Sequence, residues 1–155
     1  MAVTSNYEPY EPNPQGFTEA LLDFKSTFVG NIPFKVTGYV TTAFENVSNG
    51  DALYMRTSDG QVGKASAADG TVENAQVVGF ADADASANST VKVIVIGLKT
   101  LSGLDAGDLY FLSPSTAGAI TLTPPSSAGQ AVVRVGEAST TTKFAIRVEP
   151  PIKLS

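Results

Sequence analysis

A duplicated pattern of short hydrophobic segments constrains the fold of this chain more than any other feature. Four segments recur in the same order and at a nearly constant separation, which chance rarely produces. The matched pairs are Gly50-Asp51-Ala52-Leu53-Tyr54 with Gly107-Asp108-Leu109-Tyr110, Gly60-Gln61-Val62 with Gly118-Ala119-Ile120, Gln76–Ala81 with Val133–Ala138, and the alternating Val91, Val93 and Val95 with Phe144, Ile146 and Val148. We therefore expect two similar halves of four strands each, at about residues 50–98 and 107–148.

Hydrophobic and polar residues alternate from Phe34 onward, as is typical of strands with one buried face. Turn pairs such as Asn49-Gly50 and Asp59-Gly60 separate the alternating runs. These connections are too short for crossover helices, so residues 34–155 are predicted to form an all-β antiparallel barrel or sandwich. The predicted strands are Phe34–Thr42, Ala52–Thr57, Gln76–Ala81, Thr90–Leu98, Asp108–Leu112, Ile120–Leu122, Ala131–Ala138 and Thr142–Val148.

The duplication also predicts how the halves combine. One four-strand unit cannot close its edges or bury both faces, whereas two units paired about a pseudo-twofold axis can share one core. Gly79 and Gly136 lie at equivalent mid-strand places, where glycine indicates a bulge, a bend or a close backbone approach. The match also aligns Tyr54 with Tyr110, and we expect both in the core or at its rim.

Residues 1–16 are predicted to form an extended arm. Tyr7-Glu8-Pro9-Tyr10-Glu11-Pro12 is a tandem triplet, and its prolines forbid a helix and deny donors to a sheet. A polyproline-like conformation is expected. The alternatives are a frayed terminus and an arm that docks on a neighbouring molecule. The tyrosines favour docking through Tyr7, Pro9, Tyr10 and Pro12, because tyrosine offers contact area at low entropy cost.

Residues 17–33 are predicted to form a short helix and a connector. Thr18 is a suitable N-cap, and Gly30 and Pro33 end the helix after Phe28. Four hydrophobic side chains recur at spacings typical of one helix face: Phe17, Leu21, Phe24 and Phe28. This stripe packs either on the β-domain of its own chain or in a contact between subunits.

The composition argues against an enzyme. The chain has no cysteine, histidine or tryptophan, which excludes disulfides, thiolate or imidazole metal sites and the common Ser-His and Cys-His nucleophiles. Asp51 and Asp108 each follow a glycine in the repeat, which indicates turn residues rather than a catalytic acid pair. We expect no catalytic residue, no metal and no cofactor.

Two segments imitate ligand-binding motifs. Asp82–Asn88 begins like a calcium loop but has Ala87 at the sixth position and Val93 at the twelfth, so a solvated loop is predicted. Gly60–Ala65 has the flavour of a phosphate loop, but its spacing is wrong and Ala65 stands where serine or threonine is required. A hairpin is predicted there instead.

The charge pattern excludes further classes. Ten basic and fifteen acidic residues give a net charge of −5, and the scattered cations do not suit phosphate binding, so no nucleic-acid partner is expected. The apolar stretch Val93–Ile96 is too short to span a bilayer, and the first residues lack the basic start and apolar core of a signal peptide. We expect no membrane contact, and synthesis in the cytoplasm.

The second half contains an ordered set of motifs: Gly107-Asp108-Leu109-Tyr110, Gly118-Ala119-Ile120, Pro124-Pro125, Gly129, Val132-Val133, Val135-Gly136 and Ala138. The first half echoes them through Gly50-Asp51, Gly60 and Val78-Gly79-Phe80-Ala81. These motifs resemble those of small virion proteins of tailed bacteriophages, found in head decoration (cement) proteins and in some tail-appendage modules. The resemblance covers roughly Phe34 to Val148.

The resemblance implies a structural function. Head decoration proteins of this sort are typically homotrimers that sit where capsomers meet and clamp the shell. The implied partners are copies of the same chain and the shell of major capsid protein, and the implied location is the capsid exterior, with the host cytoplasm during assembly. The alternatives are a tail-appendage or fibre-anchoring module and a glycan-binding module that stacks sugars on Tyr39, Tyr54 and Tyr110.

Overall fold

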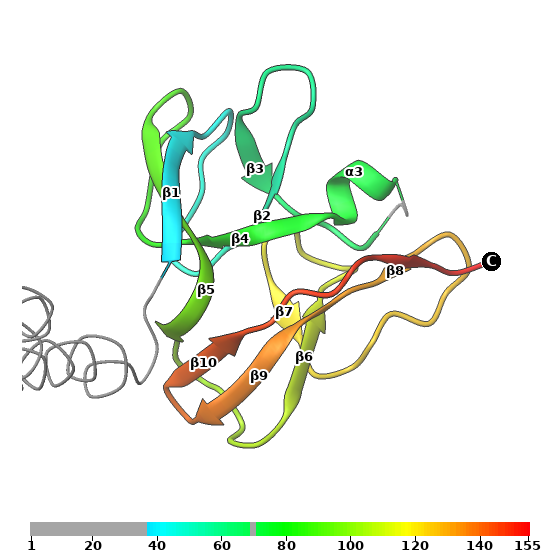
Figure 1. Ribbon diagram of the computed structural model, residues 1–155. Coiled ribbons are helices and arrows are strands. Elements are labelled where there is room, and N and C mark those ends of the chain that lie inside the picture. Colours follow the sequence, from blue (N-terminus) through cyan, green and yellow to red (C-terminus); the bar gives the residue numbers. More distant parts are fainter. Residues whose placement is uncertain (1–36, 69–70) are drawn as a thin grey trace, which may run out of the picture. The chain divides into compact units, whose positions relative to one another are not determined.

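The computed structural model describes residues 37–68 and 71–155. The predicted arm and the predicted helix lie outside these residues. Val36–Ser155 forms one compact unit, in which a curled antiparallel sheet makes a half-barrel (Figure 1). Strands account for 46% of the structure and helix for 3%, which confirms the prediction of an all-β domain.

Each predicted strand region contains a strand, with small shifts at the ends. The strand β3 lies in the segment predicted as a hairpin, Gly60–Ala65. Three features were not predicted: the short helix α3, the terminal strand β11, and an interruption at Val133 that divides one predicted strand into β8 and β9. The elements are β1 (Thr37–Thr42), β2 (Ala52–Met55), β3 (Val62–Lys64), α3 (Val72–Ala75), β4 (Val77–Ala81), β5 (Thr90–Thr100), β6 (Leu109–Leu112), β7 (Ile120–Thr121), β8 (Ala131–Val132), β9 (Arg134–Thr140), β10 (Lys143–Ile146) and β11 (Ile152–Lys153).

The strand order is symmetric about its centre. It runs β3-β2-β4-β5-β10-β9-β6-β7, so that β3-β2-β4-β5 is mirrored by β7-β6-β9-β10. The long strand β5 joins the halves, because its first part pairs with β1 and its last four residues pair with β10. Figure 1 shows β5 leading from the half that holds β1–β4 to the half that holds β6–β10. A small second sheet pairs β8 with β11.

The Gly-Asp motifs perform the same backbone task in both halves. Gly50 N donates to Ala81 O at 2.9 Å, and Gly107 N donates to Ala138 O at 2.7 Å. In return, the carbonyl oxygens of the two aspartates accept hydrogen bonds at 2.9 Å from the amides of Ala81 and Ala138. Each motif therefore anchors the start of one strand to the strand across from it.

The expected match between Tyr54 and Tyr110 is wrong by one residue. Gly79 lies opposite Leu53, and Gly136 lies opposite Tyr110. The ladder therefore makes Tyr110 the counterpart of Leu53, and the counterpart of Tyr54 is Phe111. The physical reason is that a register is fixed by backbone pairing around the glycine, and a slip of one residue would exchange the two faces of the strand.

The expected match of the last strands is also shifted. Ala81 pairs with Val93 in the first half, and Ala138 pairs with Phe144 in the second. Val93 is therefore the counterpart of Phe144, where the sequence match had aligned Val91. A shift of two residues keeps the same face toward the core, which is why the hydrophobic pattern alone did not reveal it.

The first half curls until its two edges meet. The parallel bridge between Ala43 and Val62 brings the end of β1 to β3, and Phe44 N donates to Val62 O at 3.0 Å. Side chains from all five strands fill the space enclosed, with Tyr39 partly buried among them. The buried members of this cluster are Ala43, Val47, Leu53, Val62, Ala81, Val91 and Val93.

The second half packs against the outside of the first. Phe80 lies on the outer face of the first half and meets Phe144 edge-to-face, with ring centroids 5.5 Å apart. Tyr110 packs on the same Phe144 ring at 5.8 Å. These rings belong to a cluster that contains residues of both halves. A shared cluster therefore joins the halves, but the first half also encloses a cluster of its own, where the duplication had predicted a single closed core.

Candidate interaction surface

The interaction residues predicted from the sequence all lie outside the described residues. They are Tyr7, Pro9, Tyr10, Pro12, Phe17, Leu21, Phe24 and Phe28. The structure therefore does not place them relative to one another.

The three tyrosines do not form a common stacking surface. Tyr110 is only 5% exposed, and its hydroxyl accepts a hydrogen bond from Asp105 N at 2.9 Å. Tyr39 packs in the cluster enclosed by the first half, where burial raises the pKa of its hydroxyl. Tyr54 is half-buried and meets Phe44 edge-to-face at 5.8 Å. Tyr110 therefore has a structural role in the core.

The two motif-like segments have structural partners. Asp82 forms an ion pair with Lys92, with 3.1 Å between Oδ2 and Nζ. Asp84 Oδ1 accepts a hydrogen bond from Asn49 N at 2.7 Å. The two carboxylates therefore bind different partners. The predicted hairpin at Gly60–Ala65 is confirmed by the antiparallel β2–β3 pair. Its Lys64 amide donates to Glu45 Oε1 at 2.8 Å.

A buried lysine lies where the two halves join. Lys99 is 6% exposed, and its Nζ donates to Asn49 Oδ1 at 2.8 Å and lies 3.7 Å from Asp82 Oδ1. Burial lowers the pKa of Lys99, whereas the hydrogen bond from Lys92 is the main cause that lowers the pKa of Asp82. A cavity of about 250 Å³ adjoins the ammonium group, lined by Asn49, Asp82, Ile94, Leu98, Lys99 and Thr100.

A groove of about 510 Å³ lies beside α3, lined by Met55, Arg56, Thr57, Gly60, Glu73, Gln76 and Val78. Its charged groups already have partners within the chain. Arg56 lies 4.2 Å above the centroid of the Phe44 ring and pairs with Asp59. Glu73 Oε1 accepts hydrogen bonds from the amide and the hydroxyl of Thr57, which lower the pKa of Glu73. These contacts indicate a structural role for the groove.

The outer face of β6, β9 and β10 combines exposed apolar and charged side chains. Leu109 is 41% exposed and Phe111 is half-buried. Phe111 lies opposite Arg134 in the β6–β9 ladder, and Arg147 follows the last residue of β10. We call this surface the β6–β9–β10 face and define it by Leu109, Phe111, Arg134, Glu137 and Arg147.

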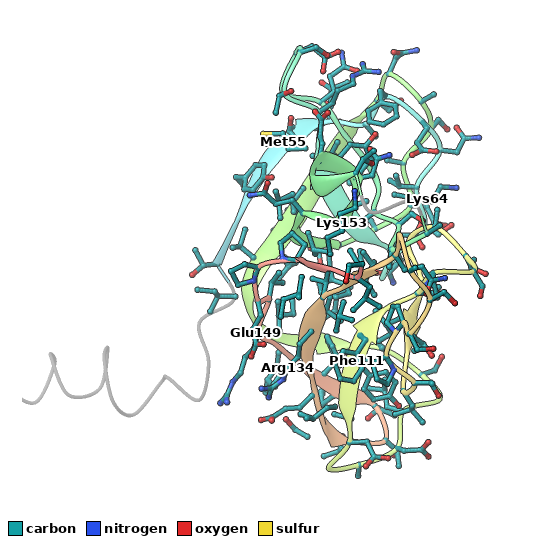
Figure 2. The ribbon with its side chains drawn as sticks, turned by 90° about the vertical axis from the view of Figure 1, so that its right-hand side faces the viewer. Met55, Lys64, Phe111, Arg134, Glu149 and Lys153 are labelled. Carbon is teal, nitrogen blue, oxygen red and sulfur yellow. The ribbon has the colours of Figure 1, made fainter. Side chains whose placement is uncertain are left out.

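Several N–H groups of the two arginines on this face have no close acceptor among the described residues. Arg134 Nη1 lies 3.1 Å from Glu149 Oε1, but its Nη2 is 3.6 Å from Glu137 Oε2. Arg147 Nη1 is 3.8 Å from Glu137 Oε1. Arg134 Nε is buried and finds no acceptor among residues 37–68 and 71–155. Figure 2 shows Phe111, Arg134 and Glu149 close together on the side turned toward the viewer.

Sequence reasoning did not find this face. Its residues alternate as in any strand with one buried face. Nothing in the pattern distinguishes an outward position that is exposed from one that other residues cover.

Among the described residues, no helix is long and apolar enough to span a membrane, and no three acidic side chains gather as metal ligands. No family model matches the chain, and no curated protein matches it.

Proposed function

We propose that this protein is a head decoration protein of a tailed bacteriophage, which binds the assembled capsid as a homotrimer and stabilises it. The proposal rests on the residue pattern of the two halves, which resembles that of such virion proteins. Gly107-Asp108 joins the start of β6 to β9, the strand that contains Val135-Gly136, and Gly50-Asp51 makes the same bonds in the first half. The shared residues therefore serve as the framework of a doubled β-domain.

In the proposed mechanism the protein stabilises the capsid by burying surface against several capsid subunits and catalyses no reaction. An ordinary contact buries about 800 Å² on each partner, and many copies on one shell turn a modest affinity into stable occupancy. A net charge of −5 suits the outside of a shell better than the side that faces packaged DNA. Trimer contacts are heterologous and closed, so each copy offers two different surfaces to its neighbours.

A tail-appendage or fibre-anchoring module is the second candidate, because the same residue pattern occurs in such modules. The number of copies per particle separates the two. Hundreds of copies in purified virions indicate the head, whereas a handful indicates the tail. A glycan-binding module has less support, because Tyr110 lies in the core and cannot stack on a sugar.

The test has two measurements on the full chain. The mass in solution is expected to be that of a trimer, and purified capsids that lack the protein are expected to take it up to a saturating number of copies. A variant without residues 1–16 is then compared at equal concentration, and lower occupancy assigns shell or neighbour contacts to the arm. A trimer that leaves the capsids bare would contradict the proposed function.

A further inference from the structure

The outer faces of the two halves are equivalent in the repeat but differ in burial. In the first half, Ala52, Phe80 and Ile94 are at most 1% exposed, because the second half covers them. Their counterparts in the ladder are Leu109, Glu137 and Ala145. None of these three is buried within the described residues, and Leu109 is 41% exposed. The duplication thus has one covered face and one face that remains open.

The open face has the chemistry of a peptide-binding surface. Phe111 and Leu109 supply apolar contact, and they lie two residues apart on one side of β6. Arg134 and Arg147 lie beside them with only one ion pair shorter than 3.5 Å, the one to Glu149. Arginine donors arranged in this way suit carboxylates, which accept two parallel hydrogen bonds from one guanidinium group.

One segment of this chain has the complementary chemistry. The first 24 residues contain Glu8, Glu11, Glu19 and Asp23 but no lysine or arginine. In the tandem Tyr-Glu-Pro triplet, aromatic and acidic side chains alternate at a period of three. Glutamates three residues apart in such a segment can each meet a different guanidinium group, and the tyrosine beside each glutamate supplies apolar contact.

We propose that Tyr7–Pro12 of one copy docks on the β6–β9–β10 face of a neighbouring copy; the choice of a neighbour rests on the proposed function. Glu8 and Glu11 accept hydrogen bonds from Arg134 and Arg147, and the tyrosine rings pack on Phe111 and Leu109. Residues 13–36 connect the segment to β1 and can span tens of ångströms at about 3.3 Å per residue.

Cysteine cross-linking tests the contact in the full chain, because the natural sequence has no cysteine. Tyr10→Cys chains are mixed with Leu109→Cys chains and treated with a short bis-maleimide. A cross-linked dimer is the expected product. Val40→Cys is the control, since Val40 is an apolar residue on β1 of the first half that is even more exposed than Leu109. It should give about tenfold less product if docking is specific.

Charge reversal tests the recognition itself. Arg147, 63% exposed, is changed to Glu in the Leu109→Cys chain, and the cross-linking yield is expected to fall about tenfold. Glu8→Lys and Glu11→Lys in the Tyr10→Cys chain are expected to restore it. Equal yields at positions 109 and 40, no product that joins position 10 of one chain to position 109 of another, or no response to charge reversal would each overturn the inference.

The outcomes separate this inference from the proposed function. A trimer that saturates capsids but gives no specific cross-link leaves the proposed function standing and removes the docking contact. A specific, charge-dependent cross-link together with bare capsids supports the contact and contradicts the capsid function. The two conclusions therefore fail independently.

Discussion

Gly79 and Gly136 occupy the same place in the two halves, and each faces a carbonyl group of the next strand. Their φ angles are +155° and +157°, and each lies beside a register shift at which the neighbouring Val78 or Val135 is the extra residue. A Cβ on Gly79 would meet Ile94 O, and one on Gly136 would meet Ala145 O. Close backbone approach at a bend therefore explains both mid-strand glycines.

Replacing either glycine by alanine is expected to lower the free energy of unfolding by about 2–4 kcal/mol, because the new methyl collides with backbone that cannot move aside. Urea denaturation measures this loss. Gly103→Ala is the matched control: Gly103 also has a positive φ, +72°, but has open space where the Cβ would lie, so only the backbone cost of about 1 kcal/mol is expected. Equal losses in all three variants would contradict the close-approach explanation.

The sequence was informative where local rules decide the structure. Alternation predicted the strand regions, and the repeat predicted two similar halves but not the order of their strands, which the structure shows to be mirrored. The sequence was misleading where strand pairing determines which residues are equivalent. Matching the two tyrosines by residue type aligned Tyr110 with Tyr54, whereas the strand pairing aligns Tyr110 with Leu53. The Lys99 site was also missed, because an isolated lysine in a strand shows no sign of the Asn49 and Asp82 side chains that the fold brings to it.

Lys99→Met is expected to be neutral or to raise the free energy of unfolding, since a buried ammonium is costly to desolvate and methionine fills a similar volume. Asp82→Asn is expected to lower it by about 1–2 kcal/mol, moderated by the 40% exposure of Asp82. Lys92→Met is the control for charge removal, with an expected loss below about 1 kcal/mol because Lys92 is half-exposed. A strongly destabilised Lys99→Met variant would refute the cost assigned to burial.

The pKa of Lys99 predicts a rise of stability with pH. Burial lowers this pKa below 10.5 in the folded chain, so between the folded value and 10.5 the unfolded chain binds more protons. Stability of the natural protein should therefore increase over this interval relative to Lys99→Met. Tyr39 acts in the opposite direction above pH 10.0, because its pKa is raised, but it is present in both proteins and cancels in the difference. Denaturation curves from neutral pH to about pH 10.5 measure the effect, and a constant difference would contradict it.

The pKa of Asp82 predicts a loss of stability in acid. Its folded pKa lies below 3.8, chiefly through the Lys92 hydrogen bond, so its contribution is complete above pH 3.8 and disappears as pH falls through the folded value. The difference in free energy of unfolding between the natural protein and Asp82→Asn should shrink over that interval. Lys92→Met removes the hydrogen bond that chiefly lowers the pKa of Asp82, so it should weaken this pH dependence. If the pH dependence of stability were the same in Asp82→Asn as in the natural protein, other carboxylates would be responsible for it.

The aromatic cluster between the halves predicts a graded series of losses. Phe144→Ala removes the ring that both Phe80 and Tyr110 contact and is expected to cost about 3–5 kcal/mol. Tyr110→Phe keeps the ring but leaves the Asp105 amide without its 2.9 Å acceptor, at a cost of about 0.5–1.5 kcal/mol. Phe111→Ala, on the opposite side of the same strand, should cost less than Phe144→Ala because that ring is only half-buried. Thermal and urea unfolding rank the three variants. If Phe111→Ala proved the most destabilising, the assignment of Tyr110 rather than Phe111 to the shared core would be wrong.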